Sequence, residues 1–158
     1  MAVVLITGMS GTGKSTVVGE LRRRGYTAYD ADEDGFSEPR SEGAWGWQVD
    51  KIRDLFARCQ SHLLFFAGCS DEQALFDFDL KVLLTAPEPL MRERLRTRQT
   101  NQYGRDEGEM ERILADLRQV EPLLRQTADL VVETTQPVGE VADRILQRTA
   151  RLPEPESG

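Results

Sequence analysis

The sequence predicts an α/β fold in which a parallel sheet carries helices on both faces. The first observation is that short, β-branched apolar runs alternate along the chain with segments whose apolar residues recur at helical spacing. The second is that the first apolar run leads through a glycine-rich loop directly into a helical segment. The third is size: 158 residues, 39% of them hydrophobic and 30% charged, suit one soluble domain with a full core.

The N-terminal half begins with a strand over 3–7, because this run is short, apolar and β-branched. A helix over 14–24 follows and ends at Gly25. A short strand over 27–29 leads into an acidic run, and the polar residues 35–46 predict a loop. The next helix has one apolar face that places Cys59 in the core as a small hydrophobe; its other members are Val49, Ile52, Leu55 and Phe56.

The C-terminal half contains three more predicted strands, over 63–67, 81–85 and 130–133. A helix over 87–98 has Pro87 near its first turn, where proline is tolerated. The following helix begins near Met110, and we expect Pro122 to end it because proline cannot donate the helical hydrogen bond. A last helix is expected around 141–146. Residues 1–150 then form one domain, followed by a flexible tail over 151–158.

The glycine-rich loop matches the phosphate-binding pattern G-x-x-x-x-G-K-[ST] at every fixed position. Its glycines let successive backbone N–H groups point at one phosphate, and the helix N-terminus adds partial positive charge. We expect Lys14 to reach the β- and γ-phosphates and the Ser15 hydroxyl to ligate Mg²⁺. The alternative, a glycine-rich turn that binds nothing, fits the strand–loop–helix context less well. The expected nucleotide contacts are Gly8, Met9, Ser10, Gly11, Thr12, Gly13, Lys14, Ser15 and Thr16.

Composition excludes several classes of function. No apolar stretch is long enough to span a membrane, and the N-terminus enters a strand at once, so we expect a cytoplasmic protein without a membrane partner. A net charge of −7 argues against nucleic acid as a partner. Cys59 and Cys69 fit no metal-binding spacing and are expected to be free thiols.

This pattern resembles the P-loop kinases of small metabolites, which include adenylate kinase and other nucleoside monophosphate kinases, shikimate kinase and gluconate kinase. The resemblance implies a three-layer fold with sheet order 2-3-1-4-5 and a site at the carboxyl edge. Residues 93–98 and 104–107 are similar to the arginine-bracketed lid of adenylate kinase. A small lid over about 99–108 is therefore expected, with Arg98 and Arg105 catalytic and Arg94 at the nucleotide. The alternative is that these arginines serve solubility.

Two further segments support the resemblance. Residues 133–137, followed by a helix that starts near Val141, resemble the loop that contacts adenine in these kinases, and Thr135, Gln136 and Pro137 are the expected contacts. Asp30-Ala31-Asp32 is like the D-x-D of shikimate kinase, where one Asp faces Mg²⁺ and the acceptor. We assign Asp32 to catalysis, metal and acceptor and Asp30 to the acceptor, while the choice between the two carboxylates for the metal stays open. The alternative is an acidic turn without a ligand.

The acceptor side is less defined. Gly68 and Gln73 loosely resemble the acceptor-binding turn of nucleoside monophosphate kinases, but the stretch after the third strand lacks the Asp-Gly pair and the Arg of adenylate kinase. Trp45 and Trp47 either stack on a planar acceptor or form core beneath the loop. The negative charge of this region favours a neutral or hydroxyl-bearing acceptor, unless Arg40 or Arg53 turns inward. These residues do not name the acceptor.

The resemblance and the site residues together predict an ATP-dependent phosphotransferase. It would move the γ-phosphate of ATP to a small metabolite or nucleotide-like acceptor, with Mg²⁺, as a monomer or homodimer. The alternative is a nucleotide-binding switch or regulatory ATPase whose output is a motion and not a phosphorylated product. Dependence of ATP consumption on an added acceptor distinguishes the two.

Overall fold

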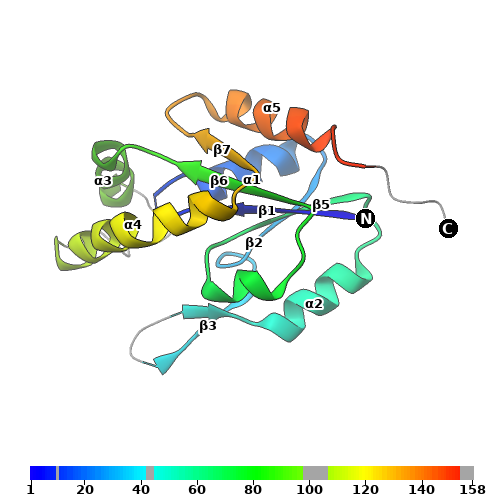
Figure 1. Cartoon of the computed structure of the whole chain (residues 1–158), viewed down its shortest axis with the longest axis horizontal. Coiled ribbons are helices and arrows are strands. Elements are labelled where there is room, and N and C mark those ends of the chain that lie inside the picture. Colours follow the sequence, from blue (N-terminus) through cyan, green and yellow to red (C-terminus); the bar gives the residue numbers. More distant parts are fainter. Residues whose placement is uncertain (10, 42–44, 98–106, 154–158) are drawn as a thin grey trace.

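A computed structural model describes residues 1–9, 11–41, 45–97 and 107–153 of the chain. Its centre is a five-stranded sheet in the order β2-β5-β1-β6-β7, with every neighbouring pair parallel (Figure 1). The strands are β1 (Ala2–Thr7), β2 (Thr27–Asp30), β5 (Leu63–Ala67), β6 (Leu80–Thr85) and β7 (Leu130–Glu133). If these five parallel strands are numbered 1 to 5 along the chain, their order in the sheet is 2-3-1-4-5. The predicted fold class is therefore confirmed.

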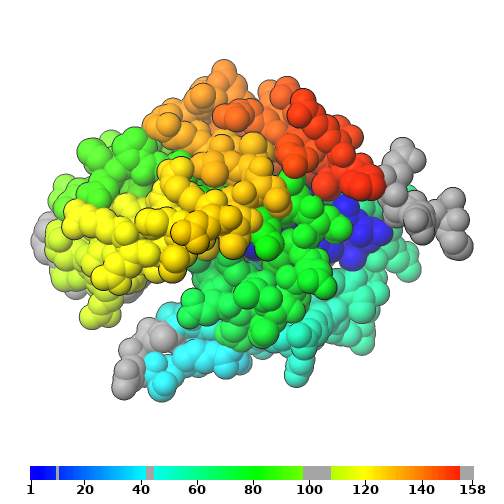
Figure 2. Space-filling view, in the orientation of Figure 1, coloured from blue at the N-terminus to red at the C-terminus, as the bar shows by residue number. Residues whose placement is uncertain are grey.

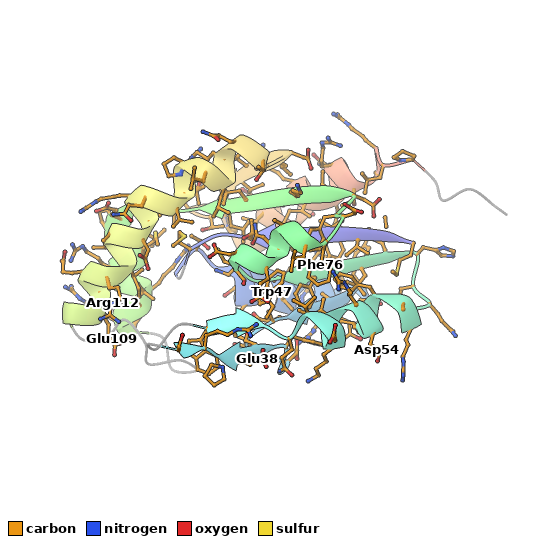
Figure 3. All side chains as sticks on the ribbon, turned by 60° about the horizontal axis from the view of Figure 1, so that its bottom comes forward. Glu38, Trp47, Asp54, Phe76, Glu109 and Arg112 are labelled. Atoms are coloured by element: carbon orange, nitrogen blue, oxygen red, sulfur yellow. The ribbon has the colours of Figure 1, made fainter. Side chains whose placement is uncertain are left out.

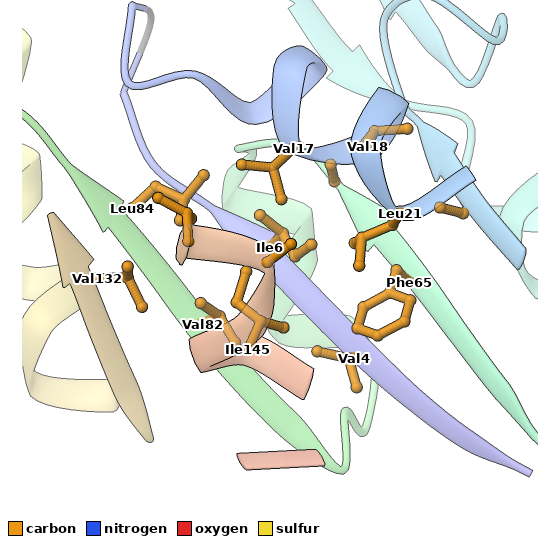
Figure 4. Close-up of a cluster of buried hydrophobic side chains, with 14 of the residues drawn as sticks. Val4, Ile6, Val17, Val18, Leu21, Phe65, Val82, Leu84, Val132 and Ile145 are labelled. Atoms are coloured by element: carbon orange, nitrogen blue, oxygen red, sulfur yellow. The ribbon is translucent and has the colours of Figure 1, made fainter. Parts of the chain in front are cut away.

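Helices cover both faces of the sheet (Figure 1). On one face lie α1 (Lys14–Arg23) and α5 (Val138–Thr149), and on the other lies α2 (Val49–Arg58). Because side chains alternate along a strand, Val4 and Ile6 of β1 join the cluster under α1 and α5, which Figure 4 shows. Val3 and Leu5 join the cluster under α2. The central strand is therefore apolar on both faces, as buried parallel strands are.

Two further helices connect the carboxyl end of β6 to the amino end of β7. They are α3 (Glu88–Thr97) and α4 (Glu107–Thr127), and they pack together through Met91, Leu95, Met110, Ile113, Leu114 and Leu117. Met9 of the glycine-rich loop packs against this cluster. The cluster thus supports that loop from the α3 side. None of the described helices is both long and apolar enough to cross a membrane.

The sequence predicts a loop over residues 35–46, but this region also contains one short strand and the start of another. β3 (Ser37–Pro39) pairs antiparallel with β4 (Trp45–Trp47), and Ser37 stands opposite Trp47. A 3₁₀ helix, η2 (Asp71–Leu75), follows β5 and begins with a capping box between Ser70 and Gln73. These two elements lie on the α2 side of the sheet (Figure 1).

The prediction that Pro122 ends a helix is wrong. Helix α4 continues through this proline to Thr127. Proline removes one helical hydrogen bond, but half-buried Leu124 lies beyond it on the continuing helix. Tertiary packing contributes most of the stability of a helix in a protein, and here it outweighs the local preference.

Helices α1 and α5 are joined by a chain of charges. Glu20 accepts hydrogen bonds from Arg23 at 2.5 Å and from Arg24 at 2.9 Å, and Arg24 also pairs with Asp143 of α5 at 2.7 Å. The hydrogen bond from Arg23, followed by that from Arg24, lowers the pKa of the Glu20 carboxyl to about 2. The ionised carboxylate is therefore the form that the fold prefers.

This low pKa predicts a pH-dependent contribution to stability. In the unfolded chain a glutamate titrates near pH ~4.3, so the contribution of Glu20 is complete above that pH and is lost as pH falls towards about 2. We expect Glu20→Gln to lower the urea midpoint at pH 7, and the gap to wild type to narrow by pH 3. The exposed carboxylate of Glu140 gives a control, since Glu140→Gln should show a smaller gap at pH 7. A Glu20→Gln gap that is constant with pH would contradict the ion-pair account.

Candidate active site

The phosphate loop joins β1 to α1 at the carboxyl edge of the sheet. Gly8, Gly11 and Gly13 have φ angles of +153°, +86° and +97°, a region that L side chains rarely adopt. A Cβ at Gly8 would lie 2.6 Å from the carbonyl oxygen of Leu84. The buried hydroxyl of Thr12 donates to the Met9 carbonyl at 2.8 Å. The loop is thus held as a tight turn that glycine alone permits, while Ser10 lies outside the described residues.

Lys14 and Ser15 begin α1 at the mouth of this loop. The ammonium of Lys14 donates to the carbonyls of Gly8, at 2.6 Å, and Met9, at 3.1 Å, so its positive charge lies across the loop. Ser15 and Thr16 are exposed in the first helical turn. This places one cation and two hydroxyl-bearing residues where the sequence pattern expects the phosphates.

The two candidate carboxylates have different surroundings. Asp30 is 5% exposed; one oxygen accepts from the Ser15 hydroxyl at 2.8 Å, and the other accepts from the backbone N–H groups of Asp32 and Glu33. Asp32 is exposed, and its carboxylate accepts from the Ser37 hydroxyl at 2.7 Å. Asp30 therefore meets the hydroxyl expected to ligate Mg²⁺, whereas Asp32 faces the hairpin.

This pairing fits a weakly held magnesium ion. Mg²⁺ in such sites takes one or two protein oxygens, with phosphate oxygens and water as its other ligands. Asp30 and Ser15 offer two oxygens, and among the described residues no group of three or more His, Cys, Asp or Glu forms a dedicated metal cage. The donors present are the type and number that a nucleotide-bound magnesium requires.

Arg94 of α3 connects three parts of the site. Its guanidinium donates to the Gly11 carbonyl at 3.2 Å, to the Thr134 hydroxyl at 2.8 Å and to the Thr134 carbonyl at 2.6 Å. Partial burial lowers the pKa of Arg94 from its usual value, because the charged form loses hydration. Beyond Thr134 the exposed residues Thr135, Gln136 and Pro137 lead into α5. The loop expected at the adenine is thus fixed to the phosphate loop through Arg94.

Thr134 belongs to the segment expected at the adenine, but its contact with the phosphate loop is not among the sequence-based predictions. It is 6% exposed, and its hydroxyl lies 2.7 Å from the Thr12 carbonyl and 3.2 Å from the Thr85 carbonyl. The available signal was a hydroxyl residue directly after a strand at the edge of the sheet. That signal is weak, because polar residues follow strands in most loops.

The two tryptophans have different environments. Trp45 is 67% exposed and Trp47 is 2% exposed. The Trp47 ring packs on Phe66 and Phe76, with ring centroids 5.2 and 6.1 Å apart (Figure 3). A Cβ on Gly68 would lie 2.9 Å from the Trp47 ring, so Gly68 makes room for that ring. Trp47 thus has the core role that was one of its two alternatives, and its ring is not available to an acceptor here.

Gln73 also has an internal partner. Its side-chain oxygen accepts from the Thr7 hydroxyl at 3.1 Å and from the Ser70 backbone N–H at 3.4 Å. These contacts join η2 to the end of β1. Gln73 is one of the residues expected to bind the acceptor, and its side-chain oxygen is engaged in these internal hydrogen bonds.

The cations on this side are paired. Arg40 contacts Glu38 at 2.8 Å, Glu72 at 2.9 Å and the Trp47 carbonyl at 2.8 Å. The guanidinium of Arg53 lies over the Phe76 ring, 5.6 Å from its centroid. Neither arginine turns towards the phosphate loop. A hollow of about 500 Å³ opens between the hairpin and the first turn of α2, away from the phosphate loop.

The surface is indented between α4 and the β3–β4 hairpin (Figure 2). Glu109 and Arg112 occupy the first turns of α4, and Glu38 occupies the hairpin (Figure 3). The predicted lid segment precedes these turns. Arg98 and Arg105, its two expected catalytic arginines, lie outside the described residues.

Comparisons with known proteins agree on the fold. A family model described as an AAA domain matches residues 4–115. Similar structures include a shikimate kinase from Acinetobacter baumannii in complex with shikimate (21% identity, 95% of this chain and 93% of that one, TM-score 0.67). A sugar kinase from Janibacter sp. is similar at 19% identity over 95% of both chains, with a TM-score of 0.65. A gluconokinase from Sinorhizobium meliloti is similar at 20% identity over 95% and 92% of the chains, with a TM-score of 0.58. A search of curated proteins finds no match. The chain shares the fold of P-loop small-metabolite kinases.

Proposed function

The chain belongs to the AAA domain family, and from this premise we propose that it is a kinase that transfers the γ-phosphate of ATP to a hydroxyl-bearing small molecule without negative charge. The observation that carries the proposal is the contact of Asp30 with Ser15 at the mouth of a complete phosphate-binding motif. The similarity in fold to a shikimate kinase, a sugar kinase and a gluconokinase supports transfer to a small molecule.

Each residue has a distinct role in this proposal. The loop amides and Lys14 bind the β- and γ-phosphates and offset the negative charge that spreads over the γ-phosphoryl oxygens. Ser15 and Asp30 hold Mg²⁺, which neutralises phosphate charge when bound. Asp32 orients the acceptor hydroxyl and accepts its proton. The N–H groups at the edge of the Arg94 guanidinium donate hydrogen bonds to Gly11 and Thr134. Its contact with the nucleotide would therefore be made by the planar face of the guanidinium.

The charge of the acceptor side supports an acceptor without negative charge. The described residues at or beyond the carboxyl ends of β2 and β5, 30–40 and 71–72, include seven Asp and Glu but one Arg. That cation, Arg40, pairs with Glu38 and Glu72. A carboxylate or phosphate entering here would meet net repulsion, whereas a hydroxyl needs a hydrogen-bond acceptor such as Asp32.

Matched acceptors test this proposal. We expect at least one of glucose, glucosamine and myo-inositol, which are neutral or amine-bearing polyols, to raise the rate of ADP release. With the anions gluconate, shikimate and AMP, ADP release should stay at the acceptor-free rate. Product mass should rise by one phosphoryl group. A preference for an anionic acceptor would contradict the charge argument. Slow hydrolysis of ATP that ignores all acceptors would favour the alternative function, a nucleotide switch or regulatory ATPase.

A further inference from the structure

We propose that the Thr134 hydroxyl is a positioning group that, together with Arg94, holds the phosphate loop in its binding shape. Thr134 does not need to touch the nucleotide for this role. It acts through the carbonyl of Thr12, while Arg94 holds the carbonyl of Gly11, and it lies beyond the segment that the family model matches. The inference rests on the proposed binding of a nucleotide at this loop.

Two consecutive loop carbonyls are held by these two residues. The Thr12 carbonyl lies 2.7 Å from the Thr134 hydroxyl, and the Gly11 carbonyl accepts from Arg94 at 3.2 Å. Arg94 in turn donates to both the hydroxyl and the carbonyl of Thr134. The backbone N–H of Thr134 donates to the Thr85 carbonyl at 2.8 Å, which fixes Thr134 at the end of the sheet. The Thr12 carbonyl is therefore attached to the end of the rigid sheet through the Thr134 side chain.

The geometry of the peptide bond gives this attachment a consequence for binding. In a trans peptide the C=O and the following N–H point in opposite directions. Holding the Thr12 carbonyl towards Thr134 therefore directs the Gly13 N–H the opposite way. Phosphate-binding loops work by directing such amides at the anion. Without the Thr134 hydroxyl, a buried carbonyl and a guanidinium edge each lose a partner, and the loop is free to rotate this peptide.

The test compares variants of two threonines. Thr134→Val removes the hydroxyl at nearly constant shape, and Thr134→Ser retains it. The control is Thr27→Val, because the Thr27 hydroxyl also has a side-chain partner, Ser61 at 2.6 Å, but lies at the amino end of β2. The probes are a non-hydrolysable ATP analogue and inorganic tripolyphosphate, each with Mg²⁺ and measured by titration calorimetry. Melting temperatures first show which variants are folded.

We expect Thr134→Val to lower the affinity for both probes by about tenfold, which is the effect of losing one buried hydrogen bond. Thr134→Ser should retain most of the affinity, and Thr27→Val should bind as wild type does. Unchanged tripolyphosphate affinity in folded Thr134→Val would overturn the proposal. So would a loss confined to the ATP analogue, because that indicates direct contact with the nucleoside.

A second variant keeps the proposal testable if Thr134→Val does not fold. Arg94→Lys keeps the positive charge but loses the fork that reaches Gly11 and Thr134 together. Arg94→Lys should also lower the affinity for tripolyphosphate, and an unchanged affinity in this variant would overturn the proposal. A wild-type protein that binds neither probe would refute nucleotide binding itself, which separates that failure from failure of the positioning role.

Discussion

Replacing Lys14 by Ala is expected to leave a folded protein that has lost nearly all phosphoryl transfer. Of the three lysines in the chain, Lys14 is the one in the phosphate loop, and its ammonium already lies within 2.6 Å of the Gly8 carbonyl. Loss of one preorganised charge at a reacting group costs about a hundredfold to a thousandfold in turnover, and the lysine of a phosphate loop acts on two phosphates. We expect a fall of at least that size, measured as acceptor-dependent ADP release.

The matched control is Lys81→Ala. Lys81 is the second residue of β6, so it lies near the amino end of the sheet, away from the phosphate loop. Both variants should keep the melting temperature of wild type to within a few degrees, and Lys81→Ala should keep its activity. If Lys14→Ala folds and turns over at a near-normal rate, the phosphate loop is not the reacting site.

Replacing Asp30 by Asn is expected to have the second largest effect, through the metal. The oxygen of an asparagine side chain can still accept hydrogen bonds from the backbone N–H groups of Asp32 and Glu33. The position next to the Ser15 hydroxyl, however, then holds an uncharged group in place of an anionic oxygen. Magnesium binds such a neutral site more weakly. We expect the Mg²⁺ concentration for half-maximal activity to rise at least about tenfold, together with a large fall in turnover, in a magnesium titration at saturating ATP.

Asp32→Asn provides the comparison within the same turn. Because the Asp32 carboxylate faces Ser37 and not Ser15, this variant should keep the magnesium dependence and the ATP affinity of wild type. Its turnover at saturating ATP should fall, because a group that acts in the transition state is removed. A shift in magnesium dependence for Asp32→Asn alone would reverse the assignment of the two carboxylates.

Sequence alone predicted the sheet well, because its information is local. The runs of β1 and β5 are continuous in apolar residues up to Thr7 and Ala67, as strands buried on both faces are, and the glycine-rich loop fixes the connection from β1 to α1. The β3–β4 hairpin was missed because each strand has three residues, one contains Pro39, and its support is non-local. Glu72, which accepts from the Trp47 backbone N–H, lies 25 residues further along the chain.

In the site, too, the features set by local sequence could be predicted, and those that depend on distant contacts could not. The phosphate loop could be identified from eight consecutive residues. The difference between Asp30 and Asp32 depends on the direction of one turn, which follows from the hydrogen bonds that Asp30 accepts from the backbone. Spacing alone therefore left both carboxylates as candidates. Thr134 requires knowledge of a contact across 122 positions, and no local pattern contains that information.

That long contact also bears on how the protein is made on the ribosome. The phosphate loop emerges well before its support, because the hydroxyl that reaches the Thr12 carbonyl is 122 positions later and β1 must pair with both β5 and β6. Pairings so distant in sequence form slowly, because long loops must close before they are stabilised. A nascent chain that stops before β7 therefore carries the whole phosphate-binding motif without the side chain that supports it. Nucleotide arriving during synthesis would meet an unfinished loop until β7 has joined the sheet.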